Sequence, residues 1–222
     1  MRRYRRNPDP RRNAVHSAGP PRTMTRRSRA IAVGSSPHGL RTAARAIASG
    51  AVIAYPTEAV YGLGCDPLDA AAVRRILAIK CRAEDKGLIL IAADVDSLAP
   101  FVEPLDPRRM AEIQSSWPGP NTWLLPARPD TPGWLTGSHD TLAVRVTAHP
   151  VAAALCRAWS RLGGGALVST SANLSGREPV RTVLGIRLQL DAAPDLVVTG
   201  RCGGNARPST IRDGRSGRVL RG

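Results

Sequence analysis

The sequence predicts an α/β protein with one folded domain, a twisted mixed sheet flanked by helices. Three observations support this prediction. The chain has 222 residues, which suits one domain of ordinary size. Hydrophobic residues make up 42% of the chain and charged residues 22%, as in globular proteins. Short apolar runs alternate, though not strictly, with segments of helical periodicity, and this pattern favours a mixed sheet over a purely parallel one.

The expected elements follow one another from residue 39 to the end of the chain. Apolar positions spaced three or four residues apart predict helices, and short apolar or alternating runs predict strands. The expected helices are, in order, 39–49, 69–80, 106–116, 149–160 and 181–190. The expected strands are, in order, 51–55, 88–92, 122–125, 141–146, 166–168, 196–198, 209–211 and 218–220.

Local signals mark where several elements begin and end. Gly50 ends the first helix, and Asp69 suits the N-cap of the second. Segment 117–120, Trp-Pro-Gly-Pro, ends the third helix. Segment 56–66 contains two glycines after a strand and is expected to be a loop. In 141–146 apolar and other residues alternate, which predicts a half-buried strand.

The net charge of +15 is concentrated at the N-terminus. Residues 1–30 contain ten arginines and one acid, whereas 31–222 contain 22 basic and 16 acidic residues. Residues 1–37 lack apolar periodicity and are rich in Arg, Pro and Ser, which predicts a disordered basic N-terminal extension. This extension either contacts RNA or precedes the true start at Met24. The folded domain is expected over 38–222.

Composition excludes several classes of protein. The longest uncharged apolar runs fall far short of the ~20 residues that cross a bilayer, so a membrane protein is excluded. Four cysteines without a C-x-x-C pair, and four histidines not spaced to complete a metal site, argue against disulfide and zinc scaffolds. A reducing cytoplasm fits best. The chain contains no Walker loop, and no residues read as a hydrolytic triad.

The two lysines mark the first candidate site. Thirty of the 32 basic residues are arginine, and the lysines lie close together at Lys80 and Lys86. With Arg82 they place three cations on one connection, a set that suits a polyphosphate. Lys80 falls on the buried face at a helix end, where its charge must snorkel or meet an anion. The alternative is a solvated loop, partly neutralised by Glu84 and Asp85.

Two further segments carry small polar residues after buried strands. Segment 169–176, Ser-Thr-Ser-Ala-Asn-Leu-Ser-Gly, offers hydroxyls, an amide and backbone N–H groups, which often cradle small ligands at strand ends. The alternative is an ordinary polar turn capped by Asn173. Segment 55–64 combines a threonine with two glycines but matches no standard nucleotide motif.

Taken together, the motifs resemble the YrdC-like family, the threonylcarbamoyl-AMP synthases of the short TsaC type. The matching segments, in family order, are Y-P-T-E-A-V-Y-G-L-G (55–64), K-C-R-A-E-D-K-G-L-I-L-I-A-A (80–93), W-P-G-P (117–120), L-A-V-R-V (142–146), S-T-S-A-N-L-S-G (169–176) and R-P-S-T-I-R-D (207–213). The resemblance implies a single YrdC-like catalytic domain over 38–222 with a concave basic cleft.

The resemblance also implies a reaction. L-threonine and bicarbonate form a carbamate, which attacks the α-phosphorus of ATP and gives threonylcarbamoyl-AMP and pyrophosphate. Partner proteins then transfer the threonylcarbamoyl group to the adenosine beside the anticodon of tRNA. Mg²⁺ is expected to arrive with ATP, because no carboxylate cage is visible in the sequence.

The family's motifs imply the site residues. The expected catalytic residues are Lys80 and Arg82. The expected ATP ligands are Lys80, Arg82, Lys86, Thr141, Ser169, Ser171, Asn173 and Arg221. The expected L-threonine ligands are Thr57, Arg145 and Ser209. Arg145, facing outward from its strand, should form a fork with the threonine carboxylate. Ala59 stands where many relatives have a second threonine.

Two other functions compete with synthesis of the adenylate. One is a module that binds double-stranded or ribosomal RNA, which the +6 charge of 31–222 permits, although no aromatic stacking platform is visible. The other is the carbamoyl-transfer domain of a hydrogenase-maturation protein. Such domains occur beside acylphosphatase and zinc-finger modules, which the sequence does not contain.

Overall fold

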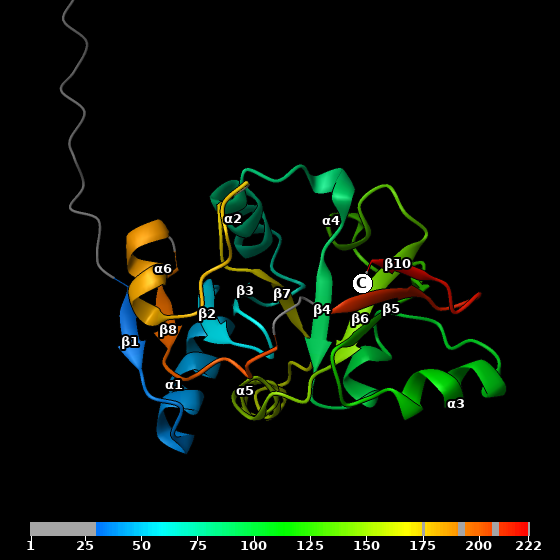
Figure 1. Cartoon of the computed structure of the whole chain (residues 1–222), viewed down its shortest axis with the longest axis horizontal. Coiled ribbons are helices and arrows are strands. Elements are labelled where there is room, and N and C mark those ends of the chain that lie inside the picture. Colours follow the sequence, from blue (N-terminus) through cyan, green and yellow to red (C-terminus); the bar gives the residue numbers. More distant parts are fainter. Residues whose placement is uncertain (1–29, 175, 191–193, 206–208, 222) are drawn as a thin grey trace, which may run out of the picture.

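A mixed sheet forms the framework of the molecule (Figure 1). The computed structural model describes residues 30–174, 176–190, 194–205 and 209–221. Ten strands lie within these ranges, in the sheet order β1-β8-β2-β3-β7-β4-β6-β5-β9-β10. Their bounds are β1 Ile31–Val33, β2 Ile53–Pro56, β3 Tyr61–Gly64, β4 Ile89–Ala92, β5 Asn121–Pro126, β6 Thr141–Val146, β7 Leu167–Ser171, β8 Leu196–Val198, β9 Thr210–Asp213 and β10 Val219–Arg221.

Parallel and antiparallel pairs are combined in this sheet. The pairs β1/β8, β2/β8, β4/β6 and β5/β9 are parallel, and the remaining neighbours are antiparallel. The predicted class, an α/β domain with a mixed sheet flanked by helices, is therefore confirmed. Strand β7 lies antiparallel between β3 and β4 and joins the two halves of the sheet.

The helices follow the sequence pattern closely. Their bounds are α1 Pro37–Ala48, α2 Ala70–Lys80, α3 Pro107–Ser115, α4 Gly133–Thr136, α5 Pro150–Ser160 and α6 Val183–Gln189, with 3-10 turns at Glu84–Lys86 and Asp96–Leu98. The predicted N-cap of α2 is confirmed, since Asp69 Oδ1 accepts from the backbone N–H groups of Ala71 and Ala72 at 2.9 and 3.0 Å. Only α4 and the two 3-10 turns were not expected.

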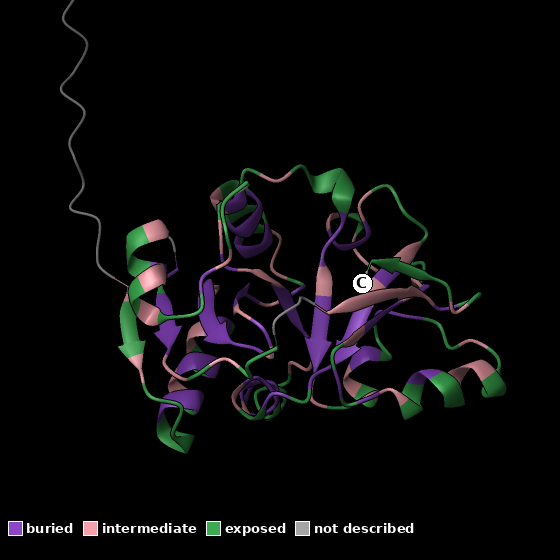
Figure 2. Ribbon diagram, viewed as in Figure 1, coloured by how far each residue is buried: buried purple, intermediate pink, exposed green. Residues whose placement is uncertain are grey.

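Alternate residues of the strands supply two apolar cores on opposite faces of the sheet. Tyr55 and Ile91 join the core that contains residues of α1 and α5, whereas their neighbours Ala54 and Leu90 join the core that contains residues of α2. The central strands are consequently buried on both faces, as Figure 2 shows. Burial on both sides explains why these strands read as continuous apolar runs in the sequence.

Two strands lie where the sequence predicted none. Ile31–Val33 belongs to the predicted disordered extension 1–37, but it forms β1 and pairs with β8, so that prediction is wrong for this segment. Residues 1–29 lie outside the described residues. The expected loop 56–66 contains β3, which was not predicted because Gly62 and Gly64 interrupt its pattern of side chains. A Cβ at Gly64 would lie 2.4 Å from the Val168 carbonyl oxygen, so only glycine permits this packing.

None of the helices in the described ranges is both long enough and apolar enough to span a membrane.

Candidate active site

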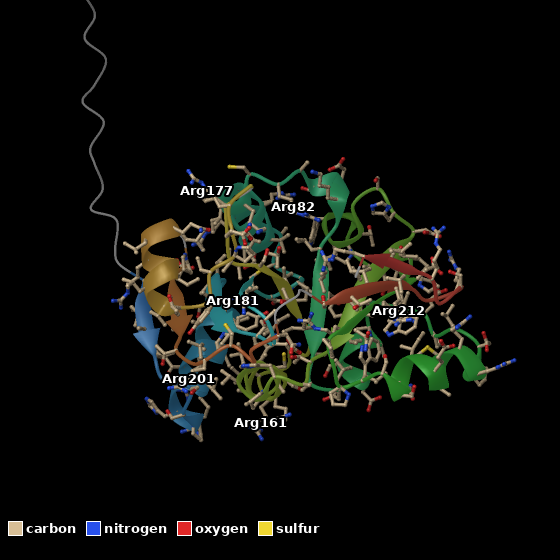
Figure 3. The ribbon with its side chains drawn as sticks, viewed as in Figure 1. Arg82, Arg161, Arg177, Arg181, Arg201 and Arg212 are labelled. Carbon is tan, nitrogen blue, oxygen red and sulfur yellow. The ribbon has the colours of Figure 1, made fainter. Side chains whose placement is uncertain are left out.

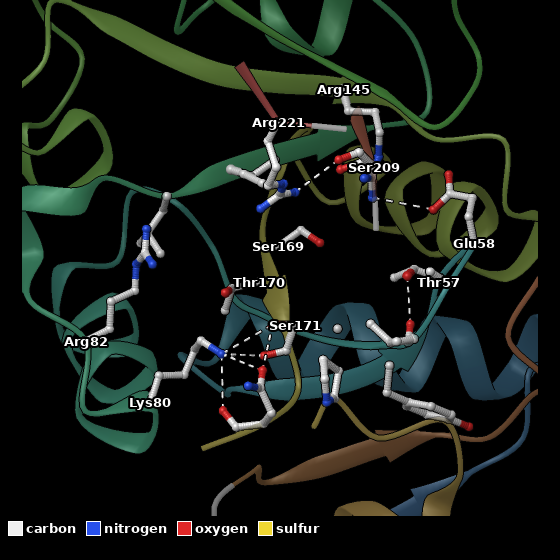
Figure 4. A pocket seen from close by; sticks show the side chains of 18 of the residues that line it. Thr57, Glu58, Lys80, Arg82, Arg145, Ser169, Thr170, Ser171, Ser209 and Arg221 are labelled. Atoms are coloured by element: carbon white, nitrogen blue, oxygen red, sulfur yellow. Dashed lines mark hydrogen bonds and ion pairs between the residues drawn. The ribbon is translucent and has the colours of Figure 1, made fainter. Parts of the chain in front are cut away.

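A cavity of about 360 Å³ opens among the ends of α2, β3, β4 and β7 (Figure 4). The turn between β2 and β3 and the connection after α2 line it, together with Arg145 of β6, Ser209 and Arg221. Five of its lining residues are basic and one is acidic: Lys80, Arg82, Lys86, Arg145 and Arg221 against Glu58. A concave surface with this excess of positive charge attracts anions.

Lys80 is buried at one end of the cavity, as its position on the inner face of α2 predicts. Its side chain reaches the turn after β7, where Nζ donates hydrogen bonds to Ser171 O at 2.6 Å, Asn173 O at 3.1 Å and Asn173 Oδ1 at 3.0 Å. The charge therefore meets carbonyl oxygens of the protein. Burial, and then the charge of Arg82, lower the pKa of Lys80 to about 8.

The hydroxyl-rich turn is held by its own asparagine as well as by Lys80. Ser171 Oγ donates to Asn173 Oδ1 at 2.6 Å, and Asn173 Nδ2 donates to the carbonyls of Leu174 and Arg177 at 3.0 and 2.8 Å. The predicted polar turn capped by Asn173 is therefore confirmed, while its use as a ligand cradle stays a prediction. Ser169 and Thr170 precede it on β7, and both line the cavity.

The loop after α2 is folded back by Arg82. Its Nη2 donates to Lys86 O at 3.1 Å and to Gly87 O at 2.9 Å, and its Nε is buried without a hydrogen-bond partner. Gly87 has a φ of 59°, a conformation that favours glycine. The Lys86 side chain is exposed and forms no hydrogen bond or ion pair with any described residue. Lys86 therefore presents an uncommitted ammonium group to a ligand.

Arg145 points away from the apolar face of β6, as expected, but it is buried rather than open to solvent. Its side chain is 9% exposed, and Nη2 lies 3.4 Å from Glu58 Oε2. The strand alternation showed that Arg145 leaves the apolar face, but it could not show that the turn containing Glu58 covers the other face. Burial alone would raise the pKa of Glu58, but the charge of Arg145 and a hydrogen bond from Thr147 outweigh it and lower the pKa.

The C-terminal strands complete the wall beside Arg145. Arg221 Nη2 donates to Ser209 O at 3.1 Å, and Ser209 Oγ accepts from Thr122 Oγ1 at 3.1 Å. Burial and then the like charges of Arg145 and Arg82 lower the pKa of Arg221. On the opposite side Thr57 is buried, and its Oγ1 donates to Val60 O at 2.7 Å.

The structure brings together ten of the eleven residues that the sequence predicts for the site. The exception is Thr141, which does not line the cavity. It lies four residues before Arg145 on β6, or about 13 Å along an extended strand. Sequence reasoning missed Glu58 and Asn205. Glu58 could have been found, because it lies inside the P-T-E-A motif, but no pattern points to Asn205.

The donor set of the cavity suits anions rather than a bound metal. Among the described residues no group of three or more His, Cys, Asp or Glu could hold a metal ion. The four cysteines are free, with Cys65 and Cys156 buried away from solvent.

The fold and the site thus define an α/β domain with a cavity that five basic side chains and the end of β7 line. The chain belongs to the Sua5/YciO/YrdC family, whose model, described as "Telomere recombination", matches residues 45–222. It is 56% identical over 188 residues to the threonylcarbamoyl-AMP synthase of Halorhodospira halophila, which covers 85% of this chain and 96% of the relative.

Solved structures agree with this assignment. The structure of P. abyssi Sua5 complexed with L-threonine matches with a TM-score of 0.75 and 31% identity, covering 84% of this chain and 54% of that one. The chain thus spans about half the length of Sua5. The structure of E. coli YciO matches with a TM-score of 0.72 and 26% identity, covering 87% of this chain and 95% of that one.

Proposed function

We propose that the protein is a threonylcarbamoyl-AMP synthase that converts L-threonine, bicarbonate and ATP into threonylcarbamoyl-AMP, pyrophosphate and water. The observation that carries the proposal is the cavity itself. It gathers a hydroxyl-rich turn and five cations around one space, which suits a triphosphate together with a carboxylate. Relatives that are more than 50% identical over most of the chain carry this name.

The nucleotide occupies the end of the cavity near the turn after β7. Ser169, Ser171 and Asn173 provide hydrogen bonds to it, while Arg82 and Lys86 neutralise its phosphates, with Arg221 on the opposite wall. The substrate is ATP with its Mg²⁺, because the only carboxylate that lines the described cavity, Glu58, is already bonded to protein groups.

L-threonine occupies the end near Arg145. The guanidinium of Arg145 forms a fork with the carboxylate, and Thr57 and Ser209 lie on the two walls beside it. The hydroxyls of Thr57 and Ser209 are already engaged, with Val60 O and Thr122 Oγ1 respectively, and so their orientation is fixed before the substrate binds.

The chemistry needs positioning and charge neutralisation more than a strong base. The threonine amino nitrogen forms a bond to the carbon of bicarbonate, and water leaves. A carbamate oxygen then attacks the α-phosphorus of ATP, and the bond to the bridging oxygen of pyrophosphate breaks. Arg82 and Lys86 stabilise the negative charge that develops on the leaving pyrophosphate. Lys80 keeps the Ser171–Asn173 turn in place during this step.

The product is a mixed anhydride, so a second protein must accept its threonylcarbamoyl group. Downstream tRNA-modification proteins fill this role and place the group on the adenosine beside the anticodon. A cytoplasmic location, expected from the cysteines, stays a prediction. The six arginines labelled in Figure 3 lie on separate parts of the chain, and only Arg212 belongs to a strand, so these six do not define one basic stripe. Direct contact with RNA is therefore not part of the proposal.

The test is release of pyrophosphate from ATP by the full chain with Mg²⁺. Release must depend on both L-threonine and bicarbonate, and threonylcarbamoyl-AMP must appear in equal amount by mass spectrometry. If no release occurs and the chain instead binds duplex RNA tightly, the protein is an RNA-binding module and the proposal is wrong.

A further inference from the structure

Glu58 occupies a singular position in the site. It is the one acid among the residues that line the described cavity, and it lies on the turn between β2 and β3. A role limited to neutralising nearby positive charge would not require the hydrogen bonds that hold the Glu58 carboxylate. Its Oε1 accepts from Thr147 Oγ1 at 2.7 Å and from the backbone N–H of Ala148 at 3.1 Å, which fixes the carboxylate from the β6–α5 connection.

The main chain around Glu58 is anchored as well. The backbone N–H of Asn205 donates to Glu58 O at 3.0 Å, and that of Gly203 donates to Thr57 O at 3.0 Å. The adjacent Thr57 closes the turn through Val60. One segment, 147–148, thus fixes the carboxylate and another, 203–205, fixes the main chain of its turn, while the second carboxylate oxygen, Oε2, points at Arg145 (Figure 4).

Arg145 shows the complementary pattern. Its side chain is more than nine-tenths buried, yet the guanidinium forms no hydrogen bond with any described residue, and its Nε is buried without a partner. Its ion pair with Glu58, at 3.4 Å between Nη2 and Oε2, is the one specific contact that orients its guanidinium within the described structure. The other donors of the fork remain available to a ligand in the cavity that Arg145 lines.

The carboxylate oxygens of Glu58 are both turned to protein groups rather than to the open space of the cavity. Oε2 is buried behind the guanidinium, with less than 1 Å² exposed, and Oε1 is occupied by two protein donors. The carboxylate also stays ionised at neutral pH, because its pKa is lowered, and an ionised carboxylate can only accept hydrogen bonds. Glu58 therefore acts through Arg145.

We infer that Glu58 is a positioning residue, which holds the Arg145 guanidinium in the orientation that receives the carboxylate of the amino-acid substrate. The inference rests on the proposed function, in which Arg145 binds L-threonine. It makes the recognition of the carboxylate depend on a residue that never touches it.

The test compares Glu58→Gln with the wild-type full chain. Glutamine keeps an acceptor for Thr147 and Ala148 but removes the charge that faces Arg145. The KM for L-threonine should rise about tenfold, the size of effect expected when one charged partner is lost, while the KM for ATP and kcat change less than about threefold. A merely structural role would lower kcat, both affinities and the melting temperature together.

The matched control is Glu112→Gln, which removes an acid from the exposed ion pair with Arg109 outside the cavity and should change neither KM. A second probe, L-threoninamide, lacks the negative carboxylate. The wild type should bind L-threonine more tightly than L-threoninamide in calorimetry, and Glu58→Gln should lose most of this preference. If Glu58→Gln keeps the full preference, the inference is overturned.

A double-mutant cycle shows whether Glu58 acts through Arg145. In an Arg145→Gln background, Glu58→Gln should have no further effect on the KM for L-threonine; an equal further loss would overturn the inference. An inactive wild type, or an Arg145→Gln variant with unchanged KM, would instead overturn the proposed function. If Glu58→Gln does not fold, Thr147→Val replaces it, and a two- to threefold rise in the same KM is expected from loss of about one hydrogen bond.

Discussion

The two ends of the cavity hold buried cations in opposite ways. At one end the ammonium of Lys80 donates to three oxygen atoms of the turn after β7, so its donors are saturated by the protein. At the other end the guanidinium of Arg145 forms no hydrogen bond within the described residues and is oriented by Glu58 alone. A saturated cation organises the protein, whereas an unsaturated one is ready for a ligand.

The same difference between a bonded and an unbonded cation separates the two lysines. Their rarity in an arginine-rich chain indicates that both matter, but the structure separates their tasks. Lys80 is buried and bonded to the turn, while Lys86 is exposed and uncommitted in the described structure. Of the two lysines, only Lys86 has an ammonium group that can bind a phosphate without breaking a bond to the described protein. Lys80 must first break a hydrogen bond to a carbonyl oxygen before it can bind a phosphate.

The largest effect is expected from Lys80→Ala. Removal of the ammonium takes away the Lys80 hydrogen bonds to Ser171 O, Asn173 O and Asn173 Oδ1, and the turn that positions the nucleotide loses its link to α2. We expect kcat/KM to fall about 10²- to 10³-fold, the range seen when catalytic groups are misplaced. Steady-state kinetics of pyrophosphate release measures the loss, and circular dichroism should show a folded protein.

Lys86→Ala is the matched comparison for Lys80→Ala. It removes an exposed ammonium that bonds to no described residue, so the turn stays intact, and we expect the KM for ATP to rise about tenfold with kcat less affected. Equal losses in the two variants would contradict the division of tasks between the lysines. An active Lys80→Ala variant would remove Lys80 from the site altogether.

The next largest effect is expected from Arg145→Lys. Lysine keeps the charge and the ion pair with Glu58, but it cannot form two parallel hydrogen bonds with one carboxylate. We expect the KM for L-threonine to rise about tenfold, with the KM for ATP unchanged. Isothermal titration of L-threonine checks the binding step. An unchanged affinity would mean that Arg145 contributes charge alone and that its planar fork is not used.

The sequence predicted most of the residues that line the site, but it did not predict the contacts that they make. Helical spacing correctly placed Lys80 on a buried face, but its charge meets neutral carbonyl oxygens rather than the solvent or anion that the sequence led us to expect. The partner could not be predicted, because the carbonyls of Ser171 and Asn173 lie more than ninety residues away in the chain. The alternation of β6 likewise separated Arg145 from its apolar neighbours but could not reveal the turn that buries it.

The fold could be predicted wherever side-chain burial leaves a pattern. Apolar runs predicted β2 and β4 because both faces of these strands are covered. Strand β3 was missed because Gly62 and Gly64 have no side chains to form a pattern, although close packing requires them. Strand β1 was missed because it is three residues long and lies largely exposed at the edge of the sheet.

A smaller effect is expected from pH. The pKa of Lys80 is about 8, below the ordinary value of 10.5, so its ammonium loses a proton as the pH rises through about 8. One donor to the turn is then lost, and the affinity for MgATP should fall several-fold above that pH, by about one hydrogen bond. Calorimetric titration of MgATP without threonine between pH 6.5 and 9.5, in steps of about half a unit, measures this dependence.

Arg82→Gln tests whether the pH dependence arises from Lys80. Because the positive charge of Arg82 helps to lower the pKa of Lys80, its removal should raise that pKa and move the fall in affinity to higher pH. The overall affinity will be weaker in this variant, so the midpoint of the fall is compared rather than its height. A midpoint that stays in place or moves to lower pH would assign the dependence to another group.

The smallest effect is expected from removal of the first 23 residues, so that the chain starts at Met24. This truncation keeps β1 and all the residues of the cavity, and it removes seven of the ten arginines in residues 1–30. We expect kcat and both KM values to stay within about twofold, because the truncation removes none of the residues that line the cavity. A chain that starts at residue 35 is the informative contrast, since it also removes β1 and leaves β8 at the edge of the sheet. Its melting temperature should fall while that of the Met24 chain does not. A large loss of kcat on truncation to Met24 would show that the basic extension takes part in the reaction.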